Sequence, residues 1–170
     1  MYCQYKERQM KETIKHNTLN ALNTFTRDNE HSMEVVAVIN DVTFINDSKS
    51  TSAKLAAESI NSIDAELVLI LGGDDTKTDY SWFAFTNYYN IRSVIYYGRR
   101  IAEVKNIFKK HVMLIVVDNM ENAVDLSKTK ALPNQVVLFS PACSSNEAFD
   151  NYKNRGNKFK ELVLKGAEEK

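Results

Sequence analysis

Cysteine, histidine, proline and glycine are all scarce in this sequence, which has two, three, two and five of them among 170 residues. Cys3 and Cys143 lie far apart and the histidines are scattered, which argues against a structural zinc site. We interpret Cys143 as a buried small apolar residue and not as a nucleophile. No proline-rich linker, low-complexity tract or internal repeat divides the chain, so its length suits one domain with a short appendage.

Net charge and long apolar runs are also lacking. The 22 basic and 22 acidic side chains give a formal net charge of zero, which argues against an electrostatically driven nucleic-acid or membrane partner. No apolar run approaches the ~20 residues that a membrane span needs. Residues 1–17 are too charged for a signal peptide. We therefore expect a cytoplasmic protein.

Three common sequence motifs are missing as well. The chain has no G-x-x-x-x-G-K-[ST] phosphate loop, no G-x-G-x-x-G dinucleotide fingerprint and no G-x-S-x-G nucleophile elbow. If this fold handles a nucleotide, the loop that cradles its phosphates must come from elsewhere.

What the sequence does have, from residue 34 onward, is an alternation of apolar β-branched runs and helix-like stretches. We expect strands at 34–40, 42–47, 65–73, 92–98, 111–118 and 134–141, and helices near 51–63, 80–89, 99–110, 120–131 and 146–168. Near-continuous apolar runs are typical of strands buried on both faces of a parallel sheet. The pattern predicts an α/β fold: a Rossmann-like, doubly wound, mostly parallel sheet of about six strands with helices on both faces.

Two further features complete the predicted organisation. Only Asp41 separates the first two apolar runs, so we expect a tight hairpin that gives the sheet one antiparallel edge strand. Residues 5–26 have the apolar spacing of a helix. We therefore divide the chain into a helical lead-in over residues 1–30 and one α/β domain over 31–170.

In open α/β sheets, ligands bind outside the carboxyl ends of the strands, so the loops there are candidates for function. The first, "NDSKST", follows the second predicted strand. Asp47 suits ribose hydroxyls or a metal, Lys49 suits phosphate or carboxylate, and Ser50, Thr51 or Ser52 suits the cap of the next helix. The alternative interpretation is a well-capped helix with a solvated lysine.

Two more loops carry polar chemistry. Gly72 and Gly73 follow a buried strand and permit a positive φ or a close ligand approach, and the acids and Lys77 after them can orient a charged substrate. In "SPACSSNE", Pro141 ends a strand and Ser144 or Ser145 is expected to cap a helix whose N-terminus suits a carboxylate. Capping alone is the alternative for these serines.

Three segments together resemble the C-terminal domain of the Mur ligases, most closely the type that adds D-glutamate. They are "HSMEVVAVINDVTFINDSKST", "LILGGDD" and "VVLFSPACSSNEAFDNYKNRGNKF", which run from about His31 to the C-terminus. The resemblance implies a three-domain ligase of which this chain is the third domain. Residues 1–30 would then be the lead-in from a central ATPase domain that carries the phosphate loop.

The resemblance also implies a reaction and its participants. A carboxylate and ATP form an acyl phosphate, and the amine of D-glutamate attacks it to give an amide in peptidoglycan precursor synthesis. The implied partners are D-glutamate, ATP, UDP-N-acetylmuramoyl-L-alanine and the two other domains. ATP and Mg²⁺ would be held mainly by the central domain, so the isolated chain is expected to be inactive.

By motif, the resemblance assigns roles to eight residues. It implies that Asp47 and Lys49 are catalytic and that both bind the nucleotide together with His31. It also implies that D-glutamate is bound by Thr51, Lys77, Ser145, Asn146 and Tyr152. Five positions depart from the family pattern: Ser32 replaces an arginine, Ser52 an asparagine, Thr76 aligns with a lysine, and Asn146 and Tyr152 stand at positions that are commonly apolar and phenylalanine. Two alternatives therefore stay open, a non-catalytic binding or regulatory module and a related ligase for another amino acid.

Overall fold

The computed structural model describes residues 30–73, 77–146 and 148–165, so the predicted helix at 5–26 lies outside the described residues. The strands are β1 (Glu34–Ile39), β2 (Val42–Asn46), β3 (Leu67–Gly73), β4 (Ile91–Gly98), β5 (Met113–Val117) and β6 (Val136–Phe139). The helices are α2 (Ala53–Asn61), α3 (Ile101–Phe108), α4 (Met120–Lys130) and α5 (Tyr152–Leu164), with short 3₁₀ helices η1 (Tyr80–Phe85) and η2 (Tyr88–Asn90).

The six strands form one sheet in the order β1-β2-β6-β3-β4-β5. The β1–β2 pair is antiparallel and every other pair is parallel. Asn40 and Asp41 make the hairpin turn with φ values of 51° and 64°, the left-handed region that asparagine and aspartate tolerate. The predicted mostly parallel sheet with one antiparallel edge strand is confirmed.

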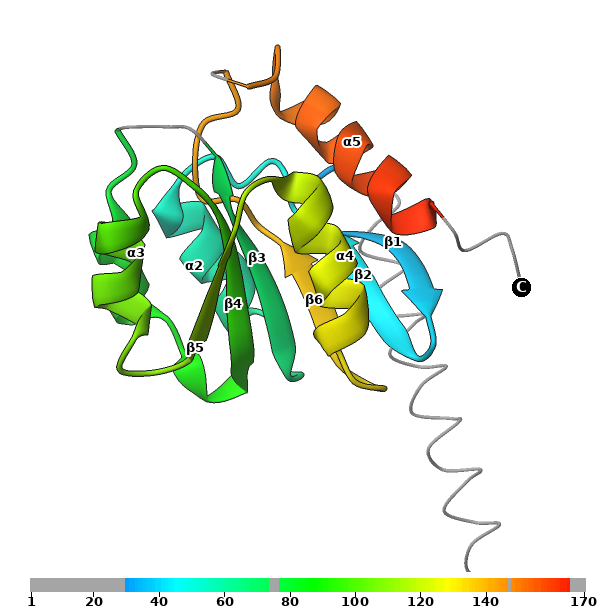
Figure 1. Cartoon of the computed structure of the whole chain (residues 1–170), viewed down its shortest axis with the longest axis horizontal. Helices are drawn as coiled ribbons and strands as arrows, with labels where there is room; N and C mark the ends of the chain where they lie inside the picture. Colours follow the sequence, from blue (N-terminus) through cyan, green and yellow to red (C-terminus); the bar gives the residue numbers. More distant parts are fainter. Residues whose placement is uncertain (1–29, 74–76, 147, 166–170) are drawn as a thin grey trace, which may run out of the picture.

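Helices cover both faces of the sheet (Figure 1), and alternate residues of the central strands belong to two different apolar layers. In β3, Leu67, Leu69 and Leu71 pack with α2, η1 and α3. Val68 and Ile70 point the other way and pack with α4 and α5. Since successive side chains of a strand alternate between faces, a strand buried on both faces needs the unbroken apolar run "LVLIL". Helices on both faces, as predicted, are therefore confirmed.

The predicted helix at 80–89 is wrong: this stretch forms two short 3₁₀ helices. Tyr80 and Phe83 are its buried aromatic residues, and their rings stack with centroids 6.1 Å apart. Residues three apart lie on the same side of a 3₁₀ helix, which has three residues per turn. The side chain of Asn87 then accepts a hydrogen bond from the N–H of Tyr89 and starts a second short turn.

The start of the last helix also differs from the prediction. The helix α5 begins at Tyr152 and not near residue 146, and its cap is the side chain of Asn151, which accepts hydrogen bonds from the N–H groups of Lys153 and Asn154. The chain after Ser145 makes a separate turn, closed by a bond of 2.9 Å from the Phe149 N–H to the Ser145 carbonyl. Neither Ser144 nor Ser145 therefore caps this helix.

No helix in the described part of the chain combines the length and the apolar character that a membrane crossing requires.

Candidate ligand-binding site

The loops that follow β2, β3 and β6 meet at one edge of the sheet and are joined by backbone hydrogen bonds. The N–H of Asp47 donates to the Phe139 carbonyl at 2.8 Å, and that of Gly72 donates to the Pro141 carbonyl at 3.1 Å. The N–H of Ala142 donates to the Ser50 carbonyl, also at 3.1 Å. We call residues 46–52, 72–73, 140–146 and 148–151 the loop cluster.

The carboxylate of Asp47 holds the loop cluster together from inside. It is buried, and it accepts hydrogen bonds from Ser50 Oγ at 2.6 Å, Ser140 Oγ at 2.8 Å and the Met33 N–H at 3.2 Å. Burial raises the pKa of this carboxyl, and the three donors oppose the shift in part. The three hydrogen bonds of this carboxylate are thus all made with other residues of the chain.

Lys49 and Thr51 lie on the outer surface of the same loop. Both side chains are exposed, and the Lys49 ammonium has no side-chain partner among the residues that the structure describes. Ser52 caps α2 by accepting a hydrogen bond from the Leu55 N–H, which selects one of the three predicted caps. This leaves Lys49 and Thr51 available to a ligand beside the N-terminus of α2.

Ser145, Asn146 and Tyr152 come from the loop and helix that follow β6. Ser145 is buried, and its hydroxyl has one long contact, 3.5 Å from Asn146 Oδ1. The side chain of Asn146 is exposed and that of Tyr152 is half-buried. The Ser48 hydroxyl donates to the Tyr152 carbonyl at 2.8 Å, so the start of α5 is fixed to the loop that carries Lys49.

His31 lies beneath α5 and not on the surface. Its side chain is 1% exposed, with Nδ1 2.9 Å from Asn46 Nδ2, and its ring meets that of Tyr152 edge-on. Burial lowers the pKa of the imidazole, and Lys160 lowers it further while Glu30 opposes the shift. The lowered pKa favours a neutral ring within the protein interior.

Two glycines and a cysteine bring the β3 and β6 loops into close contact. Gly72 and Gly73 have φ values of 135° and 151°, and a Cβ on Gly73 would lie 2.4 Å from Cys143 Sγ. Cys143 is buried and its thiol donates to the Gly72 carbonyl at 3.2 Å. The predictions of positive φ or close approach at the glycines, and of a buried Cys143, are confirmed.

Lys77 lies in the segment between β3 and η1. Its side chain is exposed, and the carbonyl of the next residue, Thr78, accepts a hydrogen bond from Arg100 Nη1. This contact holds the segment near the loop between β4 and α3.

Arg155 is a central residue of the site to which sequence reasoning gave no role. Its side chain is 1% exposed and donates to the Ser48 carbonyl and the Cys143 carbonyl, each at 2.8 Å, and to Ser48 Oγ at 3.1 Å. It therefore clamps the β2 and β6 loops from within α5. The Arg-Gly pair in the sequence was the available signal, but it does not show that the arginine is buried.

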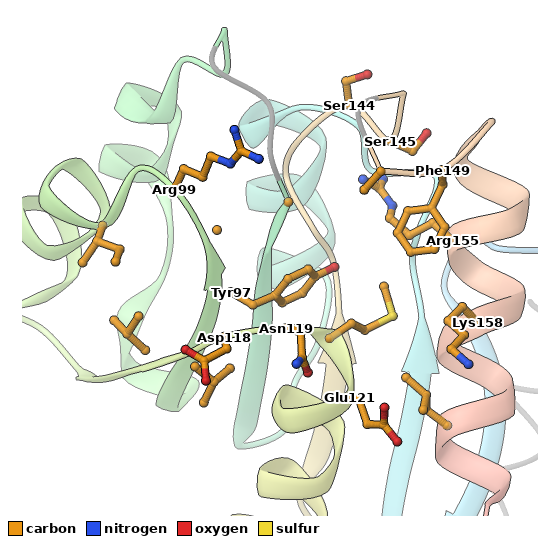
Figure 2. A pocket seen from close by; sticks show the side chains of 18 residues that line it. Tyr97, Arg99, Asp118, Asn119, Glu121, Ser144, Ser145, Phe149, Arg155 and Lys158 are labelled. Atoms are coloured by element: carbon orange, nitrogen blue, oxygen red, sulfur yellow. The ribbon is translucent and has the colours of Figure 1, made fainter.

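A cavity of about 810 Å³ opens beside the loop cluster, at the ends of β3, β4 and β5 and between α4 and α5 (Figure 2). Arg99 reaches it from the loop after β4, and Asp118 and Glu121 approach from the start of α4. Phe149 and Arg155 lie on the opposite side. We call this the α4–α5 cavity.

The described residues contain no group of three or more His, Cys, Asp and Glu side chains arranged to hold a metal ion. Within the loop cluster, Asp47 is buried and hydrogen-bonded within the chain, and Asp150 is exposed and accepts a hydrogen bond from Asn154. These residues therefore do not fit a Mg²⁺ site by themselves.

Comparison with curated proteins identifies relatives of the chain. It is 38% identical over 135 residues to the UDP-N-acetylmuramoylalanine–D-glutamate ligase of Acidobacterium capsulatum, and 36% identical over 137 residues to that of Natranaerobius thermophilus. Each match covers 79% of this chain but only 29% and 30% of the ligase. No family model matches the chain.

Comparison with solved structures supports the same relationship at the level of the fold. A domain from a putative UDP-N-acetylmuramate:L-alanyl-gamma-D-glutamyl-meso-diaminopimelate ligase of Haemophilus ducreyi superimposes with a TM-score of 0.51 at 14% identity. The match covers 78% of this chain and 97% of that domain.

The chain thus resembles the Mur ligases in sequence over 79% of its length and shares the fold of a Mur ligase domain, and the resemblance found in its motifs is confirmed. The two curated relatives named above, which are 38% and 36% identical to the chain over the matched residues, are UDP-N-acetylmuramoylalanine–D-glutamate ligases. The chain spans about three tenths of the length of these relatives.

Proposed function

We propose that this chain is the amino-acid-binding domain of a cytoplasmic ATP-dependent ligase that adds D-glutamate to UDP-N-acetylmuramoyl-L-alanine. The observation that carries the proposal is the loop cluster, in which the "NDSK" and "SPACSS" segments are joined by the Ser140–Asp47 hydrogen bond and clamped by Arg155. An amino acid with two carboxylates needs cationic and N–H or O–H donors, and this edge of the sheet offers both.

Each proposed contact follows from exposure and donor chemistry. Lys49 is the exposed cation of the cluster, and Thr51 offers a hydroxyl beside the N-terminus of α2. Ser145 offers a hydroxyl with one weak contact, and Asn146 and Tyr152 border it. We keep Lys77 as a further donor to the substrate. Together these groups would hold D-glutamate with its amine toward an acyl phosphate supplied by another domain.

For ATP, the proposed residues contribute unequally. Lys49 suits a phosphate, because it is exposed and has no side-chain partner in the described part of the chain. Asp47 and His31 are buried, so we propose that they act on the nucleotide by fixing the loop and the backbone that meet it. Mg²⁺ and most phosphate contacts would come from a central domain, and the isolated chain would not turn over.

The alternative is a binding or regulatory module that keeps the fold without the reaction. Ser32, in place of an arginine, is the feature that favours it, because serine cannot replace the cation. The same cluster would then bind D-glutamate without activating it.

An NMR titration of the chain with D-glutamate, L-glutamate and Mg-ATP tests the proposal. We expect saturable amide shifts with D-glutamate within residues 47–52 and 140–152, at least tenfold weaker binding of L-glutamate, and loss of the response in Lys49→Ala. Lys105→Ala, which removes an exposed lysine from α3, is the matched control. Equal responses to both enantiomers, or an unchanged response in Lys49→Ala, would overturn the assignment of the substrate.

A further inference from the structure

The charge of Arg155 is not neutralised by any carboxylate in the described residues. All of its hydrogen-bond acceptors are uncharged: two backbone carbonyls, the Ser48 hydroxyl and, at 3.7 Å, the Cys143 sulfur. A fully buried arginine is rare unless it is paired with a negative charge. The loop clamp alone therefore does not explain why a cation occupies this position.

The position of Arg155 in α5 adds to the imbalance. It lies in the second turn of the helix, whose first turn contains no acidic residue but does contain Lys153. The N-terminus of a helix carries a partial positive charge, which disfavours cations and favours anions. The burial of Arg155, the helix dipole and the lack of a carboxylate partner among the described residues thus all favour an anion beside this side chain.

The α4–α5 cavity is where such an anion would have access. Arg155 lines it together with the half-buried Lys158 and the serines of the "SPACSS" loop, Ser144 and Ser145. Lys158 pairs with Glu161 on the outer side of α5, at 2.8 Å. Figure 2 shows Arg155 and Lys158 on the same side of the cavity.

The rest of the lining is mostly apolar or acidic, with Arg99 as one further cation. Tyr97, Met120 and Phe149 offer apolar surface between the two helices. At the start of α4, Glu121 pairs with Lys165 at 3.2 Å and Asp118 is exposed. Arg99 lines the side near β4. The carboxylates of α4 disfavour an anion beside them, so a ligand with one anionic group would direct its charge toward the two cations of α5 or toward Arg99.

We propose that the α4–α5 cavity is a binding site for a ligand with an apolar or aromatic body and one carboxylate or phosphate group, which meets the charge of Arg155. The volume of the cavity, about 810 Å³, lies within the ~300–1,000 Å³ of small-molecule sites. The cavity shares Ser145 with the proposed D-glutamate site, but the inference rests on the charge of Arg155 and on the cavity, and not on Lys49.

Three small probes test the site in the 170-residue chain by NMR: benzoate, phenyl phosphate and neutral benzyl alcohol. We expect at least one of the two anions to bind saturably, with amide shifts confined to residues 97–99, 117–121, 144–149 and 155–162. Its affinity should exceed that of benzyl alcohol at least tenfold, and the tighter of the two anions identifies the preferred group.

Arg155→Met keeps the length of the side chain and removes the charge. It should abolish the tenfold preference for the anion, whereas Arg155→Lys should keep part of it. Arg92→Met is the matched control, since Arg92 is exposed near the opposite end of β4, and it should change nothing. If Arg155→Met does not fold, Lys158→Met should still weaken the preferred anion several-fold.

Three results would overturn the proposal. The first is equal affinity for the anions and benzyl alcohol, and the second is amide shifts confined to residues outside the cavity. The third is a preference for the anion that persists in Arg155→Met. If Arg155→Met does not fold, the third result is the same preference in Lys158→Met.

Discussion

Gly156 provides a sharp test of how α5 is seated against the rest of the domain. A Cβ added there would lie 2.2 Å from His31 Nδ1, far inside the 3.4–4 Å of ordinary van der Waals contact. The ring cannot move aside easily, because it is buried and hydrogen-bonded to Asn46. Overpacking of this kind costs ~1–3 kcal/mol, whereas glycine to alanine in a helix normally gains ~1 kcal/mol.

We therefore expect Gly156→Ala to lower the free energy of unfolding by about 1–2 kcal/mol, since a clash this close belongs near the upper end of that range. Urea denaturation followed by circular dichroism measures the change. Asn157→Ala, at the exposed neighbouring position of the same helix, is the control and should be neutral or slightly stabilising.

A double-mutant cycle assigns the effect to His31. Glycine suits the backbone of this position, where φ is 65°, so His31→Gly removes the ring without adding strain. In that background Gly156→Ala should become stabilising by up to ~1 kcal/mol. A Gly156→Ala variant that stabilises the original chain as well would refute the reasoning.

Three further predictions follow from the site. Asp47→Asn should keep the hydrogen bonds from Ser50 and Ser140 through its amide oxygen but lose the one from the Met33 N–H, because an amide nitrogen cannot accept. Because the raised pKa of Asp47 makes the folded state bind the extra proton, the stability that the original chain loses as pH rises through that pKa should not be lost in the variant. Urea midpoints from pH 4 to 8 test this; an equal pH dependence in both proteins would contradict it. Asn151→Ala should lower the free energy of unfolding by about 1 kcal/mol through loss of the α5 cap. Ser145→Ala should leave thermal stability nearly unchanged while weakening D-glutamate binding. If Ser145→Ala instead lowered the stability more than Asn151→Ala does, Ser145 would be the structural residue of the two.

Much of the fold was predictable because burial leaves a periodic record in the sequence. The runs "LVLIL" and "VVLF" predicted central strands, and they occupy β3 and β6. The aromatic-rich stretch at 80–89 was misread as one helix. Its buried residues, Tyr80 and Phe83, are three apart, a spacing that α and 3₁₀ helices share over so short a segment.

The site was predictable in its loops but not in its internal contacts. The "NDSK" and "SPACSS" segments meet as expected, and Gly72 and Gly73 adopt the positive φ predicted for them. The beginning of α5 was missed, because several polar residues before Asn151 are also capable caps. Nothing local in the sequence indicates that Arg155 is buried, since its acceptors, Ser48 and Cys143, are 107 and 12 residues away.

The measurement that tests the central claim most directly is the activity of a chimera. Residues 31–165 of this chain would replace the homologous segment of the Acidobacterium capsulatum ligase, and phosphate release would be followed as D-glutamate is added. The account predicts release that depends on D-glutamate and is lost in Lys49→Ala. A folded chimera that binds ATP but shows no D-glutamate-dependent release would contradict it.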